Sequence, residues 1–151
     1  MGEAVNDIRL VVREDTLRRS GTLVAGQVWI DFGSIMFPTP GWYDLVLPVL
    51  RFWVTNLVAL LSGRQHDVTI PFMDGPFAVR VRRLDATTLE LAALDNEREV
   101  VRLVAARDDL ARSVRDAAQR VLESSRAKGL WDRDAEELQR ELPGLSGLLQ
   151  H

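Results

Sequence analysis

Alternating hydrophobic and polar residues near the start of the chain predict a half-buried strand. Ile8, Leu10 and Val12 fall on one side of an extended segment, and Arg9 and Arg13 fall on the other. The polar stretch that follows, residues 15–21, ends in a Ser-Gly pair that is typical of a turn. The first strand is therefore expected to end near residue 14.

A second extended run, residues 22–32, is apolar on both faces. Val28 and Ile30 lie on one face, while Trp29 lies on the other beside the polar Asp31. A strand of this kind is either covered on both faces or leaves one apolar face exposed, where it can associate with another surface. A homodimer interface along this strand is one way to cover it.

The most apolar part of the chain, residues 42–61, predicts a helix of about five turns that ends at a Ser-Gly pair. Pro48 would start or kink it. Trp42 and Trp53 would share one face, about three turns apart. The stretch also contains Arg51, whose placement in a bilayer costs about 2.5–3.5 kcal/mol. We therefore expect a buried core helix and no membrane span.

Short extended segments at residues 66–73, 77–83, 89–94 and 99–105 predict an antiparallel meander. Pro71 favours an edge position or a bulge for the first of them, because proline cannot donate to a sheet ladder. On the second segment the alternation directs Arg80 and Arg82 outward.

Helical spacing replaces alternation in the last third of the chain. A stripe that includes Leu110, Val114 and Val121 begins near residue 108, and a stop is expected near Gly129. A last helix is expected to begin after Asp132 and to end before the Pro-Gly pair at 143–144.

Strands followed by helices predict a single α+β domain over residues 1–151. Its expected parts are a mainly antiparallel sheet of about five to six strands, one apolar central helix at 42–61 and two C-terminal helices.

Composition narrows the chemistry. The chain has no cysteine and two histidines, which excludes disulfides, thiolate catalysis and histidine-rich metal clusters, so no metal or cofactor is expected. Its net charge of −3 does not favour nucleic acid. Residues 1–6 lack the features of a signal peptide, so a cytoplasmic location is expected. Of the 19 basic residues only Lys128 is lysine, a bias typical of GC-rich coding sequence such as that of actinobacteria.

Catalytic patterns are weak. His66 and Asp67 are adjacent, so on a strand they would point to opposite faces. Ser34 lacks the glycine two positions later that a nucleophile elbow requires. No Gly-rich phosphate loop is present. The chain is therefore not expected to be an enzyme, although a pair of carboxylates can be drawn from Asp31, Asp44 and Asp74.

Six residues are candidates for binding. Trp29 is either a core residue or an interface anchor, and Asp74 either completes a tight Asp-Gly turn or orients a ligand. With the other polar candidates, the binding set is Trp29, Asp31, Asp44, Asp74, Arg80 and Arg82.

One part of the chain, residues 24–83, resembles a known class of proteins. The residues that carry the resemblance are Phe37-Pro38, Gly41 to Asp44, Leu50 to Trp53 and Phe72 to Phe77. In style this segment is similar to immunity proteins of polymorphic toxin systems, which combine a short sheet with a tryptophan-containing helix. The resemblance implies a protein that binds and blocks a cognate bacterial toxin through acidic and aromatic surface residues.

Three hypotheses follow. The first is a non-enzymatic protein-binding domain, in its most specific form an inhibitor of a cognate toxin. The second is a homo-oligomeric structural or accessory protein. The third is a small-molecule-binding protein or enzyme with a pocket between the apolar helix and the sheet, using Asp44, Asp74 or arginines.

Overall fold

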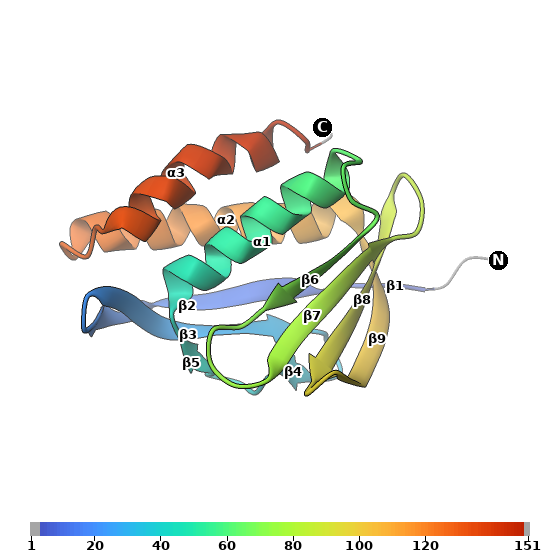
Figure 1. Ribbon diagram of the computed structural model, residues 1–151, viewed down its shortest axis with the longest axis horizontal. Helices are drawn as coiled ribbons and strands as arrows, with labels where there is room; N and C mark the ends of the chain where they lie inside the picture. Colours follow the sequence, from blue (N-terminus) through green and yellow to red (C-terminus); the bar gives the residue numbers. More distant parts are fainter. Residues whose placement is uncertain (1–3, 150–151) are drawn as a thin grey trace.

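The computed structural model describes residues 4–149, and within them it contains three helices and nine strands arranged in two sheets (Figure 1). The helices are α1 (Val46–Leu61), α2 (Arg107–Ala127) and α3 (Arg133–Ser146). The longer strands are β2 (Arg9–Ser20), β3 (Leu23–Asp31), β6 (Asp67–Pro71), β7 (Phe77–Arg83), β8 (Thr88–Asp95) and β9 (Arg98–Ala106). Three two-residue strands complete the set: β1 (Val5–Asn6), β4 (Met36–Phe37) and β5 (Tyr43–Asp44).

The α+β class and the two C-terminal helices are confirmed. The six longer strands correspond to those expected, but they divide between two sheets. One sheet has the order β1-β9-β8-β7-β6, and the other has the order β2-β3-β4 with β5 also paired to β3. Every pairing is antiparallel except that of β1 with β9.

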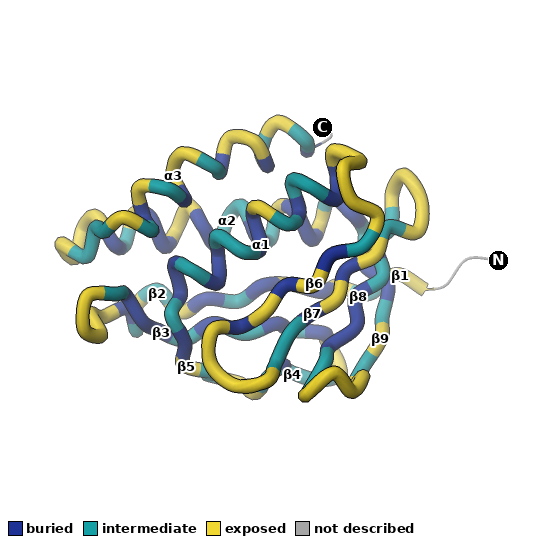
Figure 2. Tube along the Cα trace, viewed as in Figure 1, coloured by how far each residue is buried: buried dark blue, intermediate teal, exposed yellow. Residues whose placement is uncertain are grey.

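The strands of the antiparallel meander agree closely with the alternation of apolar and polar residues in the sequence. Strand β7 has the expected bounds, and its buried Val79 and Val81 alternate with the exposed Arg80 and Arg82 (Figure 2). Strand β6 lies at the edge of its sheet, which is one of the two positions that Pro71 favoured. Period-two alternation was sufficient here because one face of each strand packs on the core and the other faces water.

The expectation that the first strand ends near residue 14 is wrong, because β2 continues to Ser20 through a bulge. Pairing shifts between Arg13 and Arg18, and the Thr16 hydroxyl accepts a hydrogen bond from the Gln27 amide at 2.9 Å. This hydroxyl replaces a missing ladder partner. The bulge leaves little room for a side chain opposite it, since a Cβ on Gly26 would lie 3.0–3.2 Å from side-chain atoms of β2 and α1.

The apolar helix begins four residues later than expected, at Val46. Tyr43 and Asp44 form β5 instead, and the Trp42 carbonyl accepts a hydrogen bond from the Val28 amide at 2.8 Å. Pairing with β3 therefore keeps this segment extended. Pro48 then falls in the first helical turn, where a backbone N–H has no partner within the helix.

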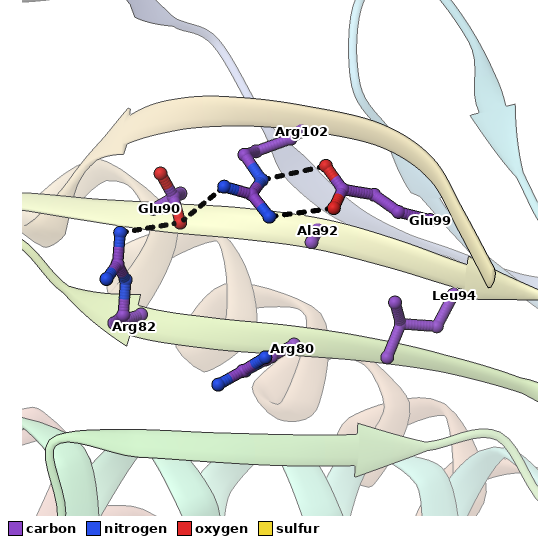
Figure 3. A pocket seen from close by; sticks show the side chains of 7 residues that line it. All are labelled: Arg80, Arg82, Glu90, Ala92, Leu94, Glu99 and Arg102. Atoms are coloured by element: carbon purple, nitrogen blue, oxygen red, sulfur yellow. Dashed lines mark hydrogen bonds and ion pairs between the residues drawn. The ribbon is translucent and has the colours of Figure 1, made fainter. Parts of the chain in front are cut away.

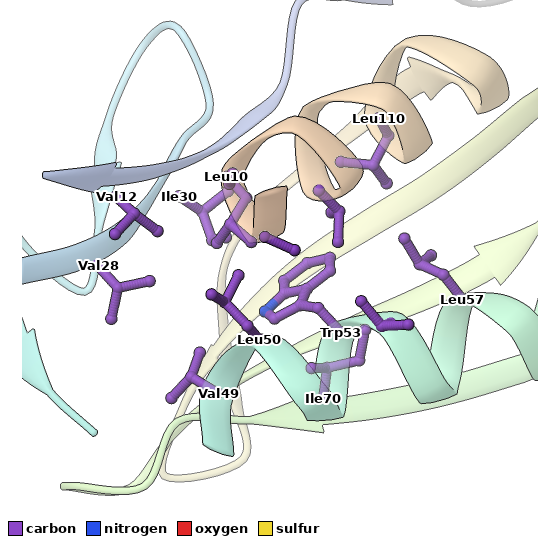
Figure 4. Close-up of a cluster of buried hydrophobic side chains, with 14 of the residues drawn as sticks. Leu10, Val12, Val28, Ile30, Val49, Leu50, Trp53, Leu57, Ile70 and Leu110 are labelled. Atoms are coloured by element: carbon purple, nitrogen blue, oxygen red, sulfur yellow. The ribbon is translucent and has the colours of Figure 1, made fainter. Parts of the chain in front are cut away.

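The expectation that Trp42 and Trp53 share a helix face is consequently wrong. Trp53 is fully buried at the centre of the core, between the strands and α2, together with Leu50 and Leu57 on the same side of α1 (Figure 4). These side chains fill the space between α1 and the sheets, where the third hypothesis located a pocket.

Aromatic side chains join the two sheets at one end of the molecule. Phe37 contacts Phe32, Phe72 and Phe77 edge to face, with ring centroids 5.7–6.5 Å apart. Trp42 continues the cluster, with its ring centroid 5.2 Å from that of Phe77. The cluster brings β5 and the loop between β6 and β7 side by side, although 30 residues separate them.

Helix α2 lies against the open edge of β2. The Ser113 hydroxyl accepts a hydrogen bond from the Leu10 amide at 2.7 Å, and Lys128 donates one to the Glu14 carbonyl at 2.8 Å. These side chains bond backbone groups of β2 that face away from its partner strand.

Helix α3 covers the outer side of α1 and α2 (Figure 1). The Asp132 carboxylate caps it by accepting from the Ala135 amide, as expected. The expectation that α3 ends before Pro143 is wrong, because it continues to Ser146 and buries Leu142 and Leu145. Within residues 4–149 none of the helices combines the length and apolar character needed to cross a membrane.

Candidate functional site

The six candidate binding residues occupy three separate places. Trp29 and Asp31 lie on the outer face of β3, Arg80 and Arg82 lie on the outer face of β7, and Asp44 and Asp74 meet beside the start of α1. The three places differ in how many of their polar groups already form hydrogen bonds or ion pairs within the protein. This difference determines what each place can bind.

The outer face of β3 offers few side-chain groups that are available to bind a ligand. Trp29 is partly buried and is paired with Val11 on β2. Asp31 accepts a hydrogen bond from the Gly33 amide at 2.7 Å, so its carboxylate shapes the turn after β3.

Arg80 and Arg82 belong to a larger set of charged residues, which we call the arginine face. Its six members come from four neighbouring strands, and all except Asp67 border a small hollow of 120 Å³ (Figure 3). They are Asp67, Arg80, Arg82, Glu90, Glu99 and Arg102.

Ion pairs on the arginine face balance its charges. Arg82 donates to Glu90 at 3.1 Å, and Arg102 forms two 2.7 Å hydrogen bonds with Glu99 (Figure 3). Arg80 pairs with Asp67 in the same manner. Three guanidinium groups thus face three carboxylates, and no excess charge remains to attract an anionic ligand.

These pairs shift proton affinities. The hydrogen bond from Arg80 lowers the pKa of Asp67, and the same contact raises the pKa of Arg80. Both directions favour the charged state of the pair.

The third place is built around Asp44, whose side chain is buried. Its Oδ2 accepts hydrogen bonds from the Trp42 indole N–H at 3.0 Å and from the amides of Met73 and Asp74 at 3.1 and 3.2 Å. Its Oδ1 accepts from the Leu45 amide at 2.7 Å. Four N–H donors therefore compensate a carboxylate that is only 4% exposed.

Through these bonds one side chain ties together β5, the start of α1 and the loop between β6 and β7. Asp44 and Asp74 are two of the three carboxylates from which a pair could be drawn. They are neighbours, but Asp44 contacts the backbone of Asp74 and not its carboxylate.

Two adjoining hollows open beside this junction. The first has a volume of 310 Å³ and is bordered by Tyr43, Asp44 and Asp74. The second has a volume of 510 Å³ and lies along the outer side of α1, with an apolar floor made by Leu23, Pro48, Phe52 and Met73. Because Met73 borders both hollows, we treat them as one surface and call it the Met73 groove.

The far wall of the Met73 groove is an ion-pair network between α1 and α3. Arg51 donates to Glu141 at 2.9 Å and to Asp134 at 3.0 Å, and the Thr55 hydroxyl donates to Glu141 at 2.9 Å. Burial lowers the pKa of Arg51, but its hydrogen bonds to the two carboxylates outweigh this effect and raise it. The network is partly exposed, with 21–32% of each charged side chain accessible.

Several residues of this groove were not candidates in the sequence. Arg51 and Thr55 are four residues apart and interrupt the apolar helix on one stripe, which was the available signal for an outward-facing side. Met73 carried no such signal, since its role depends on where the β6–β7 loop lies in the fold.

His66 is exposed, and Asp67 beside it is engaged by Arg80. In the described part of the chain no three side chains among His, Cys, Asp and Glu converge as a metal site.

The comparisons with known proteins add no relative. No family model matches the chain, and no curated protein or solved structure matches it.

We predict that Asp44→Asn lowers the free energy of unfolding by about 2 kcal/mol, because an amide turns a donor toward at least one of four N–H groups and weakens the other bonds. Urea denaturation measures this loss. Asp31→Asn is the matched control, and its expected cost is below about 1 kcal/mol because Asp31 accepts a single partly exposed bond. Equal effects of the two substitutions would contradict the role given to Asp44.

We also predict that Arg80→Gln raises the pKa of Asp67 toward the usual value of about 3.9. With Arg80 present the folded-state pKa lies below the unfolded one, so Asp67 stabilises the fold above that range. This contribution is lost as the pH falls through the folded pKa. Carbon-13 NMR of the side-chain carboxyl follows the titration. Arg102→Gln is expected to leave Asp67 unchanged, and an unchanged Asp67 in both variants would refute the assignment.

Proposed function

We propose that this chain is a non-enzymatic protein-binding domain and that the Met73 groove is its binding surface. The observation that carries the proposal is the composition of the groove: an apolar floor from three separate elements beside a row of carboxylates. Protein interfaces combine an apolar centre with a polar rim in this way.

Exposed apolar side chains support the choice of this surface. Tyr43 is 38% exposed and Met73 is 45% exposed, and both border the groove. Methionine adapts its shape to a partner, and tyrosine offers a rigid apolar ring with a polar end. The arginine face, in contrast, has its charges paired internally and contributes less to this proposal.

The most specific form of the proposal is an inhibitor of a cognate bacterial toxin. An inhibitor has to cover a functional surface on its partner and needs no catalytic group of its own. The combination of acidic and aromatic residues around the groove, Tyr43, Phe52, Asp74 and Glu141, agrees with what the resemblance to immunity proteins implies.

A capture experiment with matched variants tests the proposal. The tagged protein is used to recover partners from lysate of the source organism, and Met73→Ala is compared with Val100→Ala. Val100 is 51% exposed on β9, away from the groove, so both variants remove an exposed apolar side chain. We expect one stoichiometric partner with the unmodified protein and with Val100→Ala, and at least about fivefold weaker binding with Met73→Ala.

The captured partner then decides the specific form. If the partner stops growth when expressed alone, and co-expression with this protein restores growth, the inhibitor function is supported. Recovery of the bait alone as a dimer in light scattering would instead support the homo-oligomeric alternative. A partner retained equally by both variants would remove the groove from the account.

A further inference from the structure

We infer that the Met73 groove selects a protein segment that is both apolar and cationic, with lysine or arginine side chains placed beside hydrophobic ones. This inference rests on the proposed function and specifies the chemistry of the partner at that same surface.

The floor of the groove determines the apolar part. Pro48 and Phe52 are four residues apart on α1 and therefore lie on one face. Leu23 from the β2–β3 hairpin and Met73 from the β6–β7 loop flank them. Water is displaced from all four when an apolar side chain enters, and this displacement favours binding.

The charges around the groove determine the cationic part. Its lining residues include one guanidinium, that of Arg51, and four carboxylates: Asp44, Asp74, Asp134 and Glu141. Asp44 is compensated by four N–H donors. Among the others, Arg51 stands between two carboxylates, so the network retains one negative charge and Asp74 adds another.

Two further arginines border this surface and reduce its negative charge. The Arg18 guanidinium stacks 4.8 Å from the centre of the Tyr43 ring and donates to its hydroxyl. Arg64 lies beside Glu141 in a neighbouring hollow and donates to the Ser62 hydroxyl. Both arginines keep their positive charge, so the four carboxylates, Asp44 included, outnumber three guanidinium groups by one. A cationic side chain that enters from solvent meets Asp74 and Glu141 at the groove itself.

The form of the groove favours a protein segment over a small molecule. Sites for small molecules enclose most of the ligand surface, whereas this groove lies open along α1. An open groove contacts only one side of its ligand, which suits a segment whose other side belongs to a partner protein. A second copy of this chain is a poorer occupant, because each copy carries a net charge of −3 and like charges oppose association.

A pair of synthetic peptides tests the inference without knowledge of the natural partner. Both peptides are amphipathic, with leucine at the same helical positions, and the polar positions carry lysine in one and glutamate in the other. The protein is labelled with carbon-13 at its methionine methyl groups, so that Met73 reports on the groove and Met36 in β4, which borders neither hollow, serves as the internal reference. We expect the lysine peptide to shift Met73 and leave Met36 unchanged, and to bind at least about tenfold more tightly than the glutamate peptide.

Two substitutions separate charge from structure. Arg51→Gln and Glu141→Gln break the same ion pair, so a purely structural effect changes the affinity for the lysine peptide in the same direction. The inference predicts opposite directions: Glu141→Gln weakens binding about twofold to fivefold, and Arg51→Gln strengthens it by a similar factor. Asp74→Asn weakens binding without touching that pair, and Glu123→Gln on the exposed side of α2 is the control with an unchanged affinity.

The inference is overturned if the two peptides bind equally, if neither shifts Met73, or if both Arg51→Gln and Glu141→Gln weaken binding. It is also overturned if the Met73 signal depends on protein concentration, which would identify a second copy as the occupant. These outcomes differ from a failure of the proposed function. A natural partner that is lost with Met73→Ala but unaffected by salt and by Glu141→Gln would keep the groove as a binding surface and remove only its cationic preference.

Discussion

A carboxylate withdrawn from water has to find donors within the protein, and the requirement of Asp44 organises one whole end of this molecule. Its four donors come from Trp42, from the start of α1 and from the loop between β6 and β7. Leaving such a group unsatisfied costs several kcal/mol, so these segments are held together. The aromatic cluster around Phe37 acts at the same place, because it packs the ends of the two sheets against each other.

The Met73 groove follows from this junction. The loop between β6 and β7 is anchored by the amides of Met73 and Asp74, which leaves both side chains directed outward at the margin of α1. Helix α3 forms the opposite wall because Arg51 binds two of its carboxylates. An apolar helix that buries one face in the core thus presents its other face, with Pro48 and Phe52, between two anchored walls.

Local patterns predicted much of this fold. The meander and α2 were found because each has one buried and one exposed face, which imposes a readable period of two or of 3.6. The start of α1 was misplaced because apolar composition alone does not distinguish a helix from a strand that pairs with β3. The continuation of β2 depends on the Thr16 hydroxyl, and that of α3 on the burial of Leu145; both are tertiary effects.

The candidate site was predicted less completely. Asp44 and Asp74 were among the candidates and do lie together, but the sequence did not indicate that Asp44 would be buried and satisfied by backbone amides. Arg80 and Arg82 were correctly placed on an outer face, yet their acidic partners come from two other strands, so the sequence did not indicate that their charges would be balanced. Met73 became a central residue only through the position of its loop.

The role of Asp44 is tested most directly by amide hydrogen exchange in the unmodified protein, read at Met73, Asp74 and Gly75. All three residues are exposed in one loop, but the first two donate their amides to the buried carboxylate. The account predicts that Met73 and Asp74 exchange slowly, as the amides of neighbouring strands do, while Gly75 exchanges rapidly. Exchange of Met73 and Asp74 at the rate of Gly75 would contradict the account, because their hydrogen bonds to the Asp44 carboxylate would then give the two amides no protection.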